Sequence, residues 1–68
     1  PVADILNVDL QIKDGVDFQL FITDLMGKQV SNISNNANFI NVSSLTSGIY
    51  FLNVRTKDGV YAHKFNKI

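Results

Sequence analysis

The sequence predicts an all-β fold, a sandwich or small barrel of six to seven short antiparallel strands. Apolar and polar residues alternate along most of the chain, turn-forming residues recur at intervals of about eight to twelve positions, and no segment shows a helical periodicity. Short strands joined by tight connections favour antiparallel pairing. Because 68 residues leave room for only one core, we expect a single domain.

The first third of the chain predicts two strands. The first has an apolar residue at every second position, namely Leu6, Val8, Leu10 and Ile12. Lys13-Asp14-Gly15 follows as a turn, because Asp and Gly tolerate the backbone angles that tight turns require. The second strand directs Phe18, Leu20 and Ile22 inward.

The middle of the chain predicts a turn, a weaker strand and a second turn. Asp24-Leu25-Met26-Gly27-Lys28 forms the first turn, with Gly27 at a position unfavourable for a Cβ. A weaker strand is expected around residues 29–34. Asn35-Asn36 then turns the chain, because asparagine tolerates the left-handed backbone region better than most non-glycine residues.

The last third predicts a strand and a hairpin. Ile40 and Val42 belong to a fourth strand, and a small polar turn over residues 43–47 closes on Gly48. Residues 49–56 and 60–67 form the hairpin, with its turn at Lys57-Asp58-Gly59. The alternation places Tyr50 and Phe65 in the core together with Phe18.

Four apolar residues fall on the opposite face from the core positions of their strands: Ile5, Phe21, Ile49 and Phe51. One explanation is a strand that is buried on both sides, or a bulge that locally switches the face. The other is an exposed apolar patch that docks onto a receptor, onto the rest of a parent protein or onto a second copy. The second explanation allows a homodimer or a strand-swapped form.

The composition excludes several classes of function. Six Lys and Arg balance six Asp and Glu, so the chain lacks the basic surplus of a nucleic-acid-binding domain. It has no cysteine for a zinc site, and no apolar run approaches the ~20 residues of a membrane-spanning helix. No nucleophile motif accompanies His63, the single histidine, and a lone turn aspartate such as Asp14 or Asp58 offers too few oxygens for calcium. We therefore expect no enzyme, no cofactor and no metal site.

Three blocks of residues occur in the order and spacing of a known family. Asp24, Leu25, Gly27, Lys28 and Val30 match its pattern DLxGKxV; Ser43, Leu45, Gly48, Tyr50 and Val54 match SxLxxGxYxxxV; Lys64 and Lys67 match its closing KxxK region. Pro1 looks like the last residue of the family's opening YPNP motif. The chain thus resembles the type A C-terminal sorting domain of the type IX secretion system, also called the Por secretion system.

The resemblance implies an immunoglobulin-like antiparallel β-sandwich at the C-terminus of an exported protein of a Gram-negative bacterium. Residues 1–68 are then a single sorting domain, a fragment of a larger protein whose cargo is linked upstream. Such a domain is recognised in the periplasm, directs its parent through the outer-membrane translocon, and is removed by a sortase. The cargo reaches the cell surface or the medium, and the domain itself catalyses nothing and does not insert into the membrane.

The resemblance also implies which residues form the sorting signal: Pro1, Gly27, Lys28, Gly48, Tyr50, Lys64, Phe65 and Lys67. We expect the two glycines to shape turns and the three lysines to present basic contacts. An unpaired edge strand can add to a receptor sheet, with backbone hydrogen bonds supplying affinity.

A different class of function is a small immunoglobulin-like binding or adhesion module, contacting carbohydrate and appended to an exported enzyme. Such a module normally exposes Trp or Tyr rings on which sugars stack. The chain has no Trp, and its two tyrosines are Tyr50, expected in the core, and Tyr61. This composition disfavours the binding module.

Overall fold

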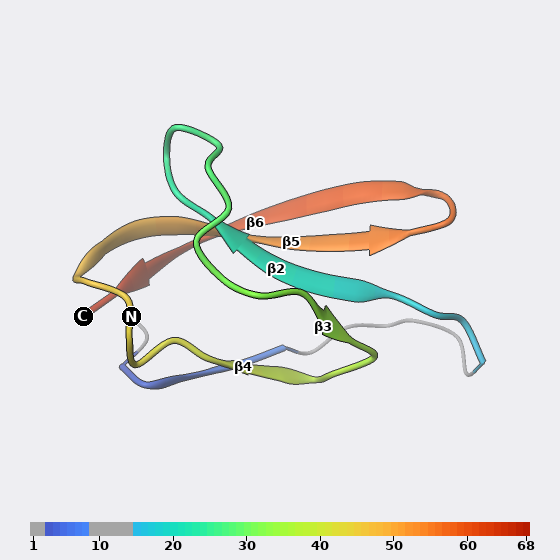
Figure 1. The fold of residues 1–68 in the computed structure, drawn as a ribbon, viewed down its shortest axis with the longest axis horizontal. Coiled ribbons are helices and arrows are strands. Elements are labelled where there is room, and N and C mark those ends of the chain that lie inside the picture. Colours follow the sequence, from blue (N-terminus) through green and yellow to red (C-terminus); the bar gives the residue numbers. More distant parts are fainter. Residues whose placement is uncertain (1–2, 9–14) are drawn as a thin grey trace.

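The computed structural model describes residues 3–8 and 15–68, which form two antiparallel β-sheets stacked on each other (Figure 1). The strands are β1 (Ile5–Asn7), β2 (Gln19–Thr23), β3 (Ser34–Asn35), β4 (Phe39–Asn41), β5 (Gly48–Thr56) and β6 (Gly59–Lys67). The larger sheet has the strand order β3-β2-β5-β6, and the smaller sheet pairs β1 with β4. The predicted all-β, antiparallel architecture is confirmed, whereas its immunoglobulin-like character stays a prediction.

The core lies between the two sheets. Its buried apolar side chains come from β2, β4, β5 and the residue after β4: Leu20, Ile22, Ile40, Val42, Tyr50, Leu52 and Val54. Phe18 and Phe65 are half-buried and pack against this cluster. Because successive side chains of a strand point to opposite faces, alternate residues of β2 and β5 supply the core, as the sequence predicts.

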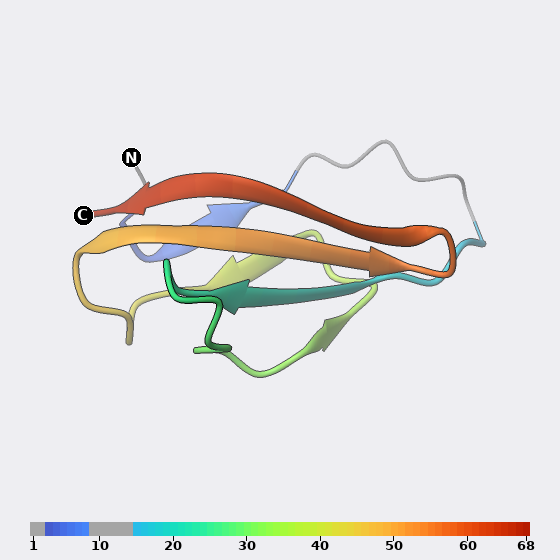
Figure 2. The same ribbon diagram turned by 90° about the horizontal axis from the view of Figure 1, so that it is seen from above.

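The β5–β6 hairpin forms one edge of the larger sheet, with β2 on the other side of β5 (Figure 2). The pairing of Thr56 with Gly59 closes the hairpin around Lys57 and Asp58, and Asp58 N–H donates to Thr56 Oγ1 at 3.1 Å. The predicted hairpin is confirmed, except that Gly59 is already the first residue of β6.

The strand predicted over residues 29–34 is wrong in its position. Gln29 makes only an isolated bridge with Thr23, and regular pairing with β2 begins at Ser34. From Thr23 back to Leu20 the strand β2 spans three residue positions, whereas the segment paired with it spans five, from Gln29 to Ser34. This segment therefore contains a bulge. Ser31 Oγ accepts a hydrogen bond from Ile22 N–H at 2.8 Å, where a regular ladder would supply a backbone carbonyl.

The turn predicted at Asn35-Asn36 is confirmed at its second residue, and Asn35 itself lies in β3. Asn36 adopts the left-handed backbone region with φ of 56°. Asn36 N–H donates to the carbonyl oxygen of Phe18 at 2.9 Å, and Phe18 N–H donates to Asn36 Oδ1, also at 2.9 Å. This reciprocal pair fastens the turn to the start of β2.

Only part of the predicted first strand lies among the described residues. β1 covers three residues, and Leu6 is half-buried against the core. Leu10, Ile12 and the first two residues of the Lys13-Asp14-Gly15 turn lie outside the described residues. The part of the chain that the structure describes contains no helix able to cross a membrane.

Candidate functional site

Five of the eight predicted signal residues lie together at one end of the β5–β6 ladder. Gly48 and Tyr50 of β5 pair with Lys67 and Phe65 of β6, and Lys64 pairs with the residue after Tyr50. Two of the three sequence blocks are therefore cross-strand neighbours. Gly27 and Lys28 lie in the separate turn between β2 and β3, and Pro1 lies outside the described residues.

Tyr50 and Phe65 stabilise this end of the hairpin. Their rings stack with centroids 5.9 Å apart and an angle of 28° between the planes. Tyr50 Oη donates to the carbonyl oxygen of Thr46 at 2.7 Å and lies 3.2 Å from Thr46 Oγ1. The hydroxyl thus fastens the polar turn over residues 43–47 to the strand that follows it, and the ring is buried.

Gly48 and Lys67 close the same end of the ladder. Gly48 has a φ of 154°, a backbone conformation that residues with side chains rarely adopt. Lys67 is only 7% exposed, and its Nζ donates to the carbonyl oxygen of Ile68 at 2.7 Å. The ammonium group of Lys67 is therefore bound by the chain's own backbone.

The turn over residues 24–28 is organised by one carboxylate. Asp24 Oδ1 accepts hydrogen bonds from Met26 N–H at 2.9 Å and from Lys28 N–H at 3.0 Å. Gly27 has a φ of 82°, as predicted for a position unfavourable to a Cβ, and its N–H donates to the Asp24 carbonyl oxygen at 3.0 Å. These bonds hold the turn in one shape, in which Leu25 is 64% exposed and Met26 is 91% exposed.

This turn rises from the larger sheet on the side opposite the smaller sheet (Figure 1). Ile49 and Phe51 of β5 face the same side, since their neighbours Tyr50 and Leu52 face the core. In the ladder, Phe51 pairs with Thr23, the last residue before the turn, and with Lys64. The exposed turn and the outward-facing residues of β5 and β6 thus lie on the same side of the larger sheet (Figure 1), and their residues are here called the outer patch: Leu25, Met26, Lys28, Ile49, Phe51 and Lys64.

The outer patch brings together basic side chains from two sequence blocks. Lys28 and Lys64 are both exposed, in contrast to Lys67. The carboxylate of Asp24 accepts hydrogen bonds from the turn's own amides, so it is engaged within the turn. The arrangement can offer two cations beside an apolar surface to an acidic and apolar partner.

The outer face of the larger sheet, which points away from the smaller sheet, contains apolar residues that the sequence places opposite the core positions of their strands. Phe21 is 8% exposed, although no strand of the described part of the chain covers this face, because the Arg55 guanidinium carbon lies 4.9 Å from the centre of its ring. Asn53 beside it is buried as well, and its Nδ2 donates to Thr23 Oγ1 at 2.9 Å and to the Phe51 carbonyl oxygen at 3.2 Å. Neither alternative from the sequence is complete: Phe21 is buried by its own sheet, whereas Ile49 remains exposed.

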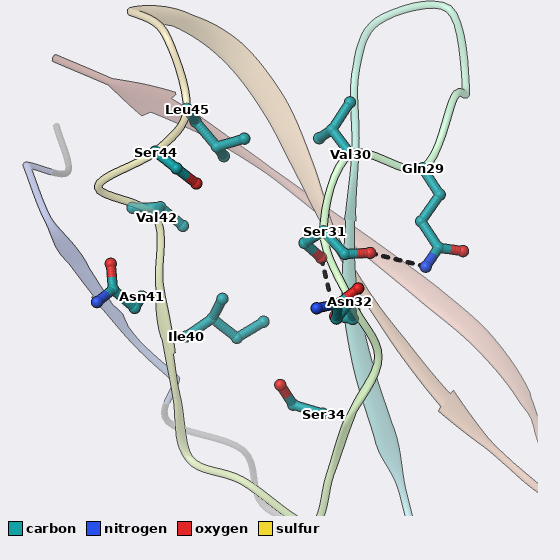
Figure 3. A pocket seen from close by; sticks show the side chains of 10 residues that line it. All are labelled: Gln29, Val30, Ser31, Asn32, Ser34, Ile40, Asn41, Val42, Ser44 and Leu45. Carbon is teal, nitrogen blue, oxygen red and sulfur yellow. Dashed lines mark hydrogen bonds between the residues drawn. The ribbon is translucent and has the colours of Figure 1, made fainter.

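A groove of about 590 Å³ opens between the bulge before β3 and the strand β4 (Figure 3). Apolar and uncharged polar side chains line it: Gln29, Val30, Ser31, Asn32, Ser34, Ile40, Asn41, Val42, Ser44 and Leu45. Gln29 Nε2 donates to the carbonyl oxygen of Ser31 at 2.7 Å. Ser31 Oγ donates to the carbonyl oxygen of Asn32 at 3.1 Å. The groove could not be predicted from the sequence, because it arises from a bulge whose one local signal is the serine Ser31 facing β2.

The described residues offer no constellation for catalysis by metal. Among them, no three His, Asp or Glu side chains come close enough to hold an ion. His63 is exposed on β6, next to Lys64.

The comparison with protein families supplies the identity that the surfaces alone do not. The model of the secretion system C-terminal sorting domain, a type IX secretion family, matches residues 1–67. The comparison with curated proteins and that with solved structures gave no match. Because the match spans nearly the whole chain and includes all three sequence blocks, the chain belongs to the family of C-terminal sorting domains of the type IX secretion system and carries its sorting signal.

Proposed function

We propose that the type IX machinery reads this domain through the outer patch, with Lys28 and Lys64 as the basic contacts. One observation supports this surface above others: the exposed Lys64 lies on the outer face of the larger sheet, and the turn that contains the exposed Lys28 rises from that same face (Figure 1). The other predicted signal residues that the structure describes serve the fold. Gly27 and Gly48 shape the backbone, Tyr50 and Phe65 pack together, and Lys67 is engaged by the chain itself.

We propose that the domain crosses the periplasm as part of a larger protein, with its cargo covalently linked upstream. Components of the translocon bind the folded domain and carry the cargo through the outer membrane. The sortase then removes the domain, and the cargo is released or retained at the cell surface. The domain has no enzymatic role in these steps and takes no cofactor.

A reporter fusion tests this proposal. Residues 1–68 are fused to a periplasm-targeted fluorescent protein in a host with the type IX machinery, and reporter is measured in the periplasm, at the surface and in the medium. The wild-type fusion should leave the periplasm and lose the mass of the domain. Retention in the periplasm, while an established sorting domain exports the same reporter, would support the binding module instead.

Charge reversals locate the surface within the same assay. Lys28→Glu and Lys64→Glu should each lower export about tenfold, because a cationic contact becomes repulsive toward an acidic partner. Lys57→Glu is the matched control, since Lys57 is exposed in the hairpin turn, at the other end of β5 from Ile49. Equal export by all three variants would exclude the outer patch.

Point substitutions are more informative here than truncation. Deleting residues 64–68 removes the strand partners of Gly48, Ile49, Tyr50 and Phe51. Loss of export would then follow from unfolding alone. The charge reversals leave these backbone pairs in place.

A further inference from the structure

The hydrogen bonds of β2 determine which backbone groups of β6 lie at the edge of the larger sheet. Ile22 N–H donates to Ser31 Oγ and its carbonyl accepts from Val30 N–H, so the polar groups of Ile22 face the β3 side. The groups of Phe21 and Thr23 therefore face β5, because these directions alternate along a strand. Their partners in β5 are Asn53 and Phe51, which face β2 in return.

The same alternation continues across β5 to β6. Leu52 faces β6, and its partner His63 faces β5, as do Tyr61 and Phe65. The amide and carbonyl groups that point away from β5 belong to the remaining residues of the strand: Val60, Ala62, Lys64 and Asn66. Among the described residues β6 has no second neighbour, and Figure 2 shows it at the rim of the sheet.

This edge carries one of the features that usually prevent association, the exposed Lys64, and lacks three others. Proteins shield edge strands with charged side chains, especially lysine, by keeping them short, by proline, or by a bulge. β6 runs regularly over nine residues without proline, and Val60 and Tyr61 are each 55% exposed on it. An edge of this kind is a template for another strand.

We propose that β6 pairs with β6 of a second copy, antiparallel and around a two-fold axis at His63. His63 is the central residue of the nine-residue strand, so this register alone overlaps its whole length. It pairs Val60 with Asn66 and Ala62 with Lys64 of the second copy. Four such pairs, each exchanging two backbone bonds, join the larger sheets with about eight hydrogen bonds.

The side chains fit the same register. Tyr61 lies opposite Phe65 of the second copy on both sides of the axis, and aromatic cross-strand pairs stabilise antiparallel sheets. Each Lys64 lies opposite the small side chain of Ala62, so no lysine faces a lysine. The two neighbouring registers are less favourable. Moving the second strand by two residues in one direction places Lys64 opposite Lys64 of the second copy. Moving it by two residues in the other direction leaves Asn66 and Lys67 without partners in the second strand.

Pairing of copies occupies the edge strand that carries Lys64. A receptor strand and a second copy therefore exclude each other at β6. The two-fold pairing needs none of the secretion machinery, so experiments on the purified 68-residue chain test it independently of export.

Cysteine cross-linking tests the register. Because the sequence contains no cysteine, an introduced cysteine can form a disulfide only with its counterpart in the second copy. In His63→Cys the two Cα atoms should lie about 4.5 Å apart, within the disulfide range of about 4.4–6.8 Å. In the control Val60→Cys, the two cysteines are six residue positions apart along the strands, about 20 Å. Under mild oxidation the first variant should become a covalent dimer, and the second should form no disulfide-linked dimer at the same concentration.

Charges at Ala62 provide a second test, since this exposed position faces Lys64 of the second copy. Ala62→Glu creates two opposite-charge pairs, and Ala62→Lys creates two like-charge pairs. Sedimentation velocity should show dimerisation about fivefold tighter in the first variant and about fivefold weaker in the second.

Three results would overturn the proposal. One is a wild-type chain that sediments as a monomer at every concentration tested. Another is cross-linking of His63→Cys no faster than of Val60→Cys. The third is a dimer whose affinity is the same for Ala62→Glu and Ala62→Lys and whose subunits do not exchange within hours. Such a dimer would contain strands exchanged between the two copies.

Discussion

Replacing Tyr50 by Phe should lower the free energy of unfolding by about 1 kcal/mol. The substitution keeps the ring, and with it the stacking on Phe65 at 5.9 Å, and removes only the hydroxyl. That hydroxyl donates to the Thr46 carbonyl oxygen at 2.7 Å, and a neutral hydrogen bond contributes about 0.5–1.5 kcal/mol net. Thr46 lies in an exposed turn, so water can reach its carbonyl after the substitution and limit the loss.

Urea unfolding followed by circular dichroism measures this loss. The midpoint should fall while the slope stays unchanged, because the surface exposed on unfolding is nearly the same. For a domain of this size, about 1 kcal/mol corresponds to a melting temperature lower by roughly 4–8 °C. Thr46→Ala is the control, since it removes Oγ1 and retains the carbonyl acceptor, and it should cost less than about 0.5 kcal/mol.

A Tyr50→Phe variant that is no less stable than Thr46→Ala would show that the hydrogen bond of the hydroxyl does not stabilise the domain. The export reporter separates the two roles that Tyr50 can have. Because the hydroxyl is bonded within the domain, Tyr50→Phe should still be exported at a temperature where it is folded. Loss of export by a folded Tyr50→Phe would make the hydroxyl a contact with the machinery.

Three further changes test other parts of the fold. Gly27→Ala should cost about 1–2 kcal/mol in urea unfolding from its φ of 82° alone, since open space surrounds the position, and Gly27→Asn should cost less. Ser31→Ala should cost about 1–3 kcal/mol in the same assay, because Ile22 N–H loses its acceptor in a part-buried position; an unchanged midpoint would mean that water replaces it. A double-mutant cycle with Arg55→Gln and Phe21→Leu should give a coupling of about 0.5–1 kcal/mol, and no coupling would remove the cation–π contact as the reason for the burial of Phe21.

The parts of the fold that follow from local signals could be predicted from the sequence. The β5–β6 hairpin is one, because its alternation and its turn residues are contained in one short stretch. The bulge before β3 is not, since it depends on Ile22 N–H meeting the side chain of Ser31. The burial of Phe21 likewise depends on Arg55, which is far away in the chain and reaches the ring only once β2 pairs with β5.

The candidate site shows the same division. The three lysines look equivalent in the sequence, yet Lys64 is exposed and Lys67 is buried. A spacing of three within one strand places two side chains on opposite faces, so this difference follows once the strand is assigned. That the turn with Lys28 lies on the same side of the sheet as Lys64 (Figure 1) requires the order β2-β5-β6, which no local pattern supplies.

The topology also orders the folding reaction. The hairpin β5–β6 joins neighbours in the chain, and isolated hairpins form within about 1–10 μs. Every other strand must close a longer loop, since Gln19 pairs with Arg55 and Ile5 pairs with Asn41, and long loops close at a higher entropic cost. We therefore expect the hairpin to form first, and β2 to add to a template that already contains Gly48, Tyr50 and Phe65. Two of the three blocks that mark the family then lie in the part of the chain expected to order earliest, whereas the turn with Lys28 is held by its own short-range hydrogen bonds to Asp24.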